Sequence, residues 1–149
     1  MIVPALGQFA SGTHHFPVRV YFEDTDLTRI VYHANYLRYM ERARTEMLRA
    51  LGIEAQAMLD AGHGYYSVHE MHVTYLAPAK LDDILTVRSH VVQVRAAATV
   101  IGQDVWRGDQ PLTRGRVTAA WLAMNGRPQR QPRDWSVRFS ALMTEANAA

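Results

Sequence analysis

One long amphipathic segment, followed only by strand-like runs, is the feature that most limits what this chain can fold into. From about residue 34 to residue 51, apolar side chains recur at intervals of three and four, and charged side chains lie mostly on the other faces. The recurring apolar residues are Leu37, Met40, Ala43, Met47, Leu48 and Leu51. Gly52 follows, where a left-handed helix cap is expected. The spacing predicts a helix of about four to five turns.

Five runs with strand character surround this helix. Before it, Val18, Val20 and Phe22 alternate with other residues in the period-two pattern of a half-buried strand. After it come four β-rich runs, at residues 65–76, 84–94, 97–108 and 116–125. One strand, one helix and four further strands favour an α+β fold in which an antiparallel sheet packs against the helix. The order is that of the hotdog fold, a curved sheet of about five strands wrapped around one long central helix.

Length and composition narrow the class further. The 149 residues are about enough for one domain. We assign residues 17–138 to this domain and expect a flexible arm at 1–16 and a tail at 139–149. The absence of cysteine excludes a disulfide scaffold, a thiolate zinc site and a cysteine nucleophile.

Neither the charge nor the hydropathy of the chain indicates binding to nucleic acid or to a membrane. The formal net charge is only +2 and no basic tract is present, so nucleic-acid binding is not indicated. No run approaches the roughly 20 apolar residues of a membrane span, and the N-terminus lacks the basic region of a signal peptide. We expect a soluble, cytoplasmic protein.

Metal and nucleophile motifs are weak. His69 and His72 are three apart in a predicted strand, so they point to opposite sides and cannot share an ion. The acidic cluster of Glu23, Asp24 and Asp26 lacks the glycine and the later glutamate of a calcium loop. No G-x-S-x-G elbow occurs. We therefore predict no metal and no cofactor.

The acidic cluster lies directly before the helix, and two interpretations compete for it. In the simpler one, the carboxylates only stabilise the helix N-terminus through its dipole, by about 0.3–1 kcal/mol. In the other, unpaired backbone N–H groups of the segment YHAN (32–35) bind an oxyanion close to a carboxylate. Such a pair of groups is sufficient for acyl transfer to water.

Residues 21–48, YFEDTDLTRIVYHANYLRYMERARTEML, decide between these interpretations by resemblance. The segment resembles the active-site region of the 4-hydroxybenzoyl-CoA thioesterase-like branch of the hotdog superfamily, and most closely the acyl-CoA thioesterases associated with the Tol-Pal system. The shared pattern is D-T-D at 24–26, V-Y-H-x-N-Y at 31–36, and E-x-x-R at Glu41 and Arg44.

The resemblance implies hydrolysis of an acyl-CoA thioester, with Asp26 as the catalytic carboxylate and the backbone N–H of His33 as the oxyanion donor. It also implies a homodimer or homotetramer whose active site lies at the dimer interface. One position departs from the pattern, because Arg29 stands where the family often has glycine. Glycine tolerates a positive φ, whereas Arg29 would have to adopt an ordinary conformation or be strained.

Other residues receive supporting roles. We expect Tyr32 to form a pocket wall and Asn35 to cap the helix, with positioning of water as the alternative for Asn35. Glu41 and Arg44 are best explained as an ion pair on one helix face. The phosphates of CoA need cations, and the candidates are Lys80, Arg95 and Arg127.

Two questions stay open at the level of sequence. Asp26 either attacks the carbonyl to form a mixed anhydride or acts as general base on water. The fold also suits a dehydratase acting on 3-hydroxyacyl thioesters, or a non-catalytic protein that binds acyl-CoA as a sensor or scaffold.

Overall fold

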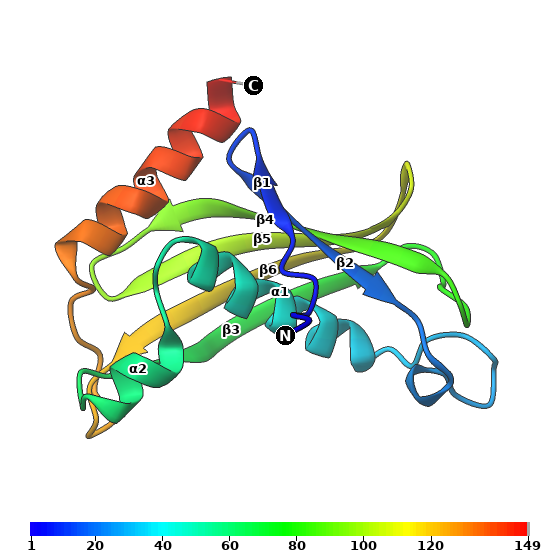
Figure 1. The fold of residues 1–149 in the computed structure, drawn as a ribbon, viewed down its shortest axis with the longest axis horizontal. Coiled ribbons are helices and arrows are strands. Elements are labelled where there is room, and N and C mark those ends of the chain that lie inside the picture. The colour runs from blue at the N-terminus through cyan, green and yellow to red at the C-terminus, as the bar shows by residue number, and fades with distance from the viewer. Residues whose placement is uncertain (149) are drawn as a thin grey trace.

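The antiparallel sheet curves around one long helix, as Figure 1 shows for the computed structural model, which describes residues 1–148. Its strands lie in the order β1-β2-β4-β5-β6-β3. Their bounds are β1 Gln8–Ala10, β2 Thr13–Arg19, β3 Tyr65–Tyr75, β4 Ile84–Val94, β5 Ala98–Arg107 and β6 Gln110–Leu122. The helices are α1 Asn35–Ala50, α2 Ala55–Asp60 and α3 Arg133–Ala148. The predicted hotdog fold is confirmed, with a sixth, short strand.

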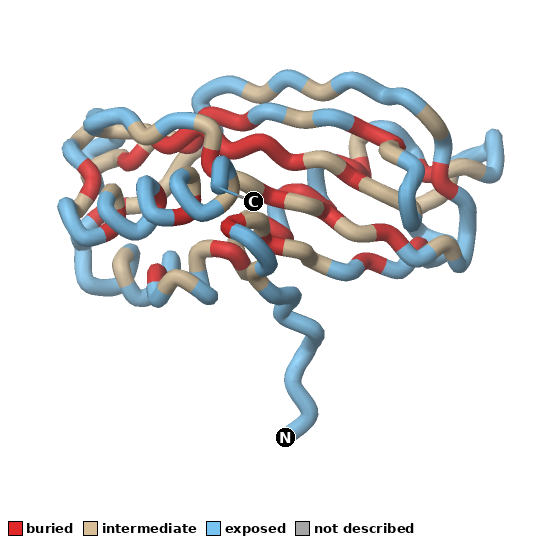
Figure 2. Tube along the Cα trace, turned by 90° about the horizontal axis from the view of Figure 1, so that it is seen from above, coloured by how far each residue is buried: buried red, intermediate tan, exposed pale blue. Residues whose placement is uncertain are grey.

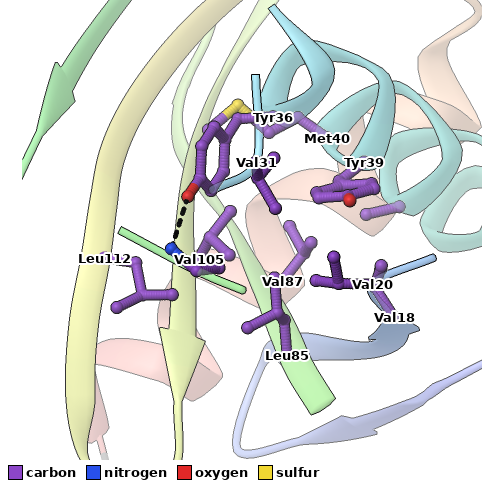
Figure 3. Packing of buried hydrophobic residues seen from close by; sticks show 12 residues of the cluster. Val18, Val20, Val31, Tyr36, Tyr39, Met40, Leu85, Val87, Val105 and Leu112 are labelled. Carbon is purple, nitrogen blue, oxygen red and sulfur yellow. Dashed lines mark hydrogen bonds between the residues drawn. The ribbon is translucent and has the colours of Figure 1, made fainter. Parts of the chain in front are cut away.

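Most of the predicted face of α1 packs against the sheet, but Leu37, in its first turn, is exposed. Met40, Ala43 and Met47 are fully buried there, and Tyr36 and Tyr39 join them. Figure 3 shows this core, in which the helix meets valine and leucine side chains of β2, β4, β5 and β6. Those strand residues include Val18, Leu85, Val87, Val105 and Leu112. Burial of this apolar stripe fixes how the helix sits in the sheet.

Gly115 of β6 lets the helix approach the sheet closely. A Cβ atom added there would lie 3.1 Å from the Met40 side chain and 2.7 Å from the Gln103 carbonyl oxygen. Because the second distance is shorter than real Cβ contacts, any larger residue would push β6 away from its neighbours.

A second cluster covers the C-terminal end of α1. Trp121 of β6 and Trp135 of α3 meet edge to face, with ring centroids 4.9 Å apart, and Tyr66 of β3 packs beside both. Phe139 and Ile53 complete the buried group. This cluster attaches α3 to the sheet and closes the end of the molecule that lies opposite the start of α1 (Figure 1).

The N-terminal part of the chain differs from the sequence prediction. Residues 8–19 form β1 and β2 instead of a loose arm, because His14 packs with Phe9 and is fully buried. Burial lowers the pKa of His14. Residues 1–7 are exposed and extend from the body in Figure 2.

Strand and helix bounds differ elsewhere too. β2 ends at Arg19, and η1, a 3-10 turn at Phe22–Asp24, replaces the expected continuation of the strand, so Phe22 is exposed. β6 begins at Gln110, six residues before the predicted run, since Gly108 and Asp109 alone make the turn. Residues 139–148 of the expected tail are part of α3, and residue 149 lies outside the described residues. None of the helices in residues 1–148 is both long and apolar enough to span a membrane.

Candidate functional site

Asp24 organises the loop that leads to α1. Its carboxylate accepts a hydrogen bond from the Tyr21 N–H at 2.9 Å, which closes the 3-10 turn. Its backbone carbonyl accepts from the Tyr32 N–H at 2.9 Å and from Asn35 Nδ2 at 2.8 Å. One residue thus ties both ends of the loop together.

Asp26 points outward at the tip of this loop and is exposed. Its Oδ1 accepts hydrogen bonds from the Thr28 hydroxyl and from the Thr28 N–H, the latter at 2.8 Å. These two bonds, together with the nearby His33 ring, hold the pKa of Asp26 below its ordinary value. Asp26 is therefore a fixed carboxylate that stays ionised in neutral solution.

Arg29 adopts the conformation that glycine would adopt. Its φ is +67°, in the left-handed region that glycine tolerates, so the arginine backbone is strained. Its N–H donates to the Asp26 carbonyl at 2.9 Å, and the Asp26 N–H donates to Ile30 at 3.1 Å. Both bonds shape the tight turn that presents the Asp26 carboxylate.

The start of α1 offers free backbone donors. Among the residues that the structure describes, none accepts a hydrogen bond from the N–H of His33 or of Ala34. The Asn35 N–H donates back to the Tyr32 carbonyl at 2.8 Å, so the chain makes a tight turn over these residues. Free donors and the positive end of the helix dipole suit a developing negative charge.

Asn35 is not the helix cap. Ala34 occupies the cap position without a side-chain bond, and Asn35 is the first residue of α1. The prediction is wrong because its amide bonds the Asp24 carbonyl, eleven residues earlier, and is buried there. Asn35 holds the acidic turn against the helix start.

Aromatic side chains surround the helix start. Tyr32 is half exposed and its ring lies 4.5 Å from the His33 ring, so it is placed to form a wall of the site. Tyr75, at the end of β3, donates its hydroxyl to the His33 carbonyl at 2.8 Å. Tyr36 lies between Tyr75 and the core, and accepts from the Ala79 N–H at 3.2 Å, the bond dashed in Figure 3.

One of the three proposed CoA-binding cations lies at this site. Lys80 forms a β-bridge with Ile30 of the acidic loop. Asp83 supports the turn around it, accepting from the Lys80 N–H at 2.9 Å and from Arg107 at 2.7 Å. Arg95 and Arg127 follow the far ends of β4 and β6, roughly 35 Å away along strands of this length. A single chain does not bring these two to Asp26.

A cleft of about 300 Å³ lies beside the later turns of α1, between α1, α2 and β3. Leu48, Leu59 and Phe139 give it an apolar wall, and Glu41 and Thr45 give it a polar side. These helix residues lie roughly 10 to 20 Å along the axis from the start of α1. The cleft and Asp26 are thus separate within one chain.

Arg44 differs from its predicted role. It donates to Gln103 Oε1 at 2.8 Å, and no ion pair joins it to Glu41 in the described part of the chain. Arg44 turns inward because Gln103, itself buried, offers an acceptor on the sheet. Glu41 lines the cleft instead, where its Oε1 accepts a long hydrogen bond from the Thr45 hydroxyl at 3.4 Å.

Two residues at the site, Thr28 and Tyr75, were not predicted from the sequence. The D-x-T spacing of Asp26 and Thr28 is a turn signal that identifies the first, since such carboxylates bond the backbone two residues on. Tyr75 carries no local signal, because its partner is 42 residues away. Within residues 1–148 no group of His, Asp and Glu is placed to hold a metal ion.

This chain is similar to known thioesterases in sequence. The family model of the thioesterase superfamily matches residues 29–113. The acyl-CoA thioesterase YbgC of Haemophilus influenzae is 38% identical over 128 residues, which are 85% of this chain and 94% of that protein. The acyl-CoA thioester hydrolase YbgC of Escherichia coli is 42% identical over 97 residues, or 65% of this chain and 72% of that protein.

Solved structures agree on the fold. A probable thioesterase from Bartonella henselae superposes with a TM-score of 0.77 at 31% identity, covering 80% of this chain and 99% of that one. A 4-hydroxybenzoyl CoA thioesterase mutant complexed with 4-hydroxybenzoyl CoA gives a TM-score of 0.76 at 22% identity, covering 85% and 97%. At that identity the second match shows the fold alone.

Proposed function

Since the chain belongs to the thioesterase superfamily, we propose that it hydrolyses an acyl-CoA to the free acid and CoA, with Asp26 and the start of α1 as its catalytic groups. The observation that carries the assignment is the pairing of an ionised, outward-facing carboxylate with free N–H donors across one short loop. No metal or cofactor has a part in it.

The thioester carbonyl oxygen lies toward the His33 N–H in this proposal. Negative charge develops on that oxygen as the carbonyl carbon becomes tetrahedral, and the amide and the helix dipole stabilise it. Removal of one such donor typically costs about 2.7–4 kcal/mol in the barrier. The Tyr32 carbonyl accepts from the Asn35 N–H, which further polarises the peptide that carries the His33 N–H.

Asp26 supplies the second group in one of two ways. As general base, it takes a proton from the attacking water, and collapse of the tetrahedral intermediate expels the CoA thiolate. As nucleophile, it attacks the carbonyl carbon, releases the thiolate and leaves a mixed anhydride that water then hydrolyses. A thiolate leaves without prior protonation, so neither route needs a strong acid beside the sulfur.

The site is completed by a second copy of the chain in this proposal, as a homodimer or homotetramer. Two features support it. The cleft that offers room for an acyl group is separate from Asp26 within one chain. β3 is also an edge strand of 11 residues with Val68 and Tyr75 about half exposed, and such an edge favours pairing with another chain.

Supporting assignments follow from the same proposal. Tyr32 walls the substrate site, Asn35 holds its loop, and Lys80 lies where it can contact a CoA phosphate. Arg95 and Arg127 can serve the same purpose only for a substrate bound to the partner's Asp26. We infer a cytoplasmic location, and association with the Tol-Pal system stays a prediction from the family.

Thiol release from a panel of short-chain, long-chain and aromatic acyl-CoAs tests the proposal. Asp26→Asn should lower kcat/KM by at least about 100-fold while the unfolding temperature is unchanged, because the side chain is exposed. Glu23→Gln removes a neighbouring charge from the same loop and serves as control, with activity within about twofold of wild type.

The rival functions give different results in the same experiment. CoA binding without thiol release by wild type would identify a binding or scaffold protein. Dehydration of a 3-hydroxyacyl-CoA without thiol release would identify a dehydratase. Asp26→Asn with more than a tenth of wild-type activity would remove Asp26 from the mechanism.

A single turnover in ¹⁸O water tests for the nucleophilic route. A mixed anhydride opened at the Asp26 carbonyl leaves ¹⁸O in Asp26, detectable by mass spectrometry of the peptide. General-base catalysis, like an anhydride opened at the acyl carbonyl, places ¹⁸O only in the released acid, so label in Asp26 is the diagnostic result.

A further inference from the structure

Among the residues that the structure describes, Tyr75 makes the one side-chain hydrogen bond to the backbone of residues 32–34, where the free N–H donors lie. Its hydroxyl donates to the His33 carbonyl at 2.8 Å, across 42 residues of sequence. Its ring meets the His33 ring edge to face at 6.2 Å and the Tyr36 ring at 5.7 Å. The tyrosine therefore contacts the element that carries the proposed oxyanion donors, without being one of them.

The His33 carbonyl needs an external donor because the helix does not supply one. In a regular helix this oxygen would accept the N–H of Leu37, four residues on. Here the Leu37 N–H donates to the Ala34 carbonyl instead, at 3.2 Å. The peptide between His33 and Ala34 thus lies outside the helical ladder, and the Tyr75 hydroxyl is what fixes its plane.

Two successive peptides consequently share one arrangement. The first has its Tyr32 carbonyl bonded to the Asn35 N–H and its His33 N–H free. The second has its His33 carbonyl bonded to Tyr75 and its Ala34 N–H free. In each, a donor at the carbonyl polarises the peptide and strengthens the N–H at the other end.

We propose that Tyr75 is a positioning residue for the reaction, which holds the His33–Ala34 peptide so that the Ala34 N–H joins the His33 N–H as a donor to the thioester oxyanion. The proposal rests on the function proposed above. It adds the Ala34 N–H as a second donor and Tyr75 as the side chain that positions this donor.

The position of the Tyr75 hydroxyl is itself fixed by the sheet. Tyr75 pairs with Thr113 at the end of β3, and the next residue, Leu76, donates to the Leu112 carbonyl at 2.8 Å. Burial raises the pKa of Tyr75 above its ordinary value, so the hydroxyl keeps its proton throughout the neutral range. The donor is therefore present whenever Asp26 is ionised.

Tyr75→Phe removes only this donor and keeps the ring contacts. The expected result is a kcat lower by about 10- to 100-fold, with KM within about twofold, because a misplaced donor weakens the transition state more than the bound substrate. Tyr36→Phe is the matched control. It removes the hydroxyl of a neighbouring tyrosine, which bonds the Ala79 N–H in the core and not the turn.

A spectroscopic measurement separates positioning from a merely structural role. The probe is a ketone analogue of the best acyl-CoA of the panel, with CH₂ in place of sulfur and ¹³C at the carbonyl, which cannot be hydrolysed. Its bound carbonyl stretch, read by difference infrared spectroscopy, should be shifted down in wild type and in Tyr36→Phe. In Tyr75→Phe the stretch should return part of the way to its value in water.

The outcomes distinguish this inference from the proposed function. A shift in Tyr75→Phe equal to that of wild type would overturn the role of Tyr75 and leave the His33 donor standing. No shift in wild type would overturn the oxyanion site itself. In a third outcome, Tyr75→Phe lowers both kcat and the unfolding temperature while the carbonyl shift stays equal to that of wild type. That result would make Tyr75 a structural residue only.

Discussion

The two ends of α1 lie in opposite surroundings. Its C-terminal end is enclosed by Trp121, Trp135 and Phe139, whose rings are buried against one another. At its N-terminal end, Asp24 accepts hydrogen bonds from backbone N–H groups and from the Asn35 amide, and Tyr75 donates to a backbone carbonyl. The carboxylate of Asp26 faces solvent there.

The difference shows how a small domain separates stability from reactivity. Apolar burial stabilises without direction, so it suits the end where nothing has to react. Oriented hydrogen bonds fix the loop, leave the N–H groups of His33 and Ala34 without partners among the described residues, and hold the Asp26 carboxylate in solvent. The reactive end can therefore be exposed, because the sheet and the other end of α1 supply the free energy of folding.

The largest expected effect tests whether the two ends are independent. Trp135→Ala opens a cavity in the aromatic cluster and should lower the free energy of unfolding by about 3–5 kcal/mol. Below its unfolding transition the variant should keep wild-type kcat/KM, since Trp135 contacts no residue of the acidic loop. Denaturant titration with activity assays on the same samples checks both; a large loss of kcat/KM in the folded variant would contradict the separation.

A smaller effect is expected from the strained turn at the reactive end. Arg29→Gly relieves a positive φ and should raise the free energy of unfolding by about 0.5–1 kcal/mol, after allowance for the greater freedom of glycine in the unfolded chain. Arg29→Ala is the matched control, because it removes the guanidinium but keeps the strain. Equal stability of the glycine and alanine variants in urea would show that the gain does not come from backbone strain.

The smallest expected effect is a change in pH dependence. Thr28→Val keeps the backbone bond to Asp26 and removes the hydroxyl bond that chiefly lowers the pKa of Asp26. The pKa should rise, so the acid limb of kcat/KM should move to higher pH while the neutral plateau stays unchanged. Thr25→Val removes a hydroxyl that bonds Phe22 instead, and its pH profile should match wild type. An unmoved limb in Thr28→Val would mean that Asp26 does not govern it.

Much of the fold was readable from the sequence, because its signals are local and periodic. The apolar stripe of α1 and the run of β4 matched the predicted bounds closely. The predictions failed where a long-range contact decides. His14 lies in β2 because this strand pairs with β4, where Ser89 is opposite His14, and Asn35 leaves the cap position because its amide reaches Asp24.

The features of the site likewise fall into those set by local sequence and those set by long-range contacts. A D-T-D turn before a helix start with free amides could be predicted from local residues, since both features lie within a dozen positions. The folded chain was needed to show that Arg29 is strained, that Lys80 lies beside the loop while Arg95 and Arg127 do not, and that Tyr75 holds the His33 carbonyl. Those facts depend on which strands the sheet places next to one another, and the free energy of the whole core sets that order.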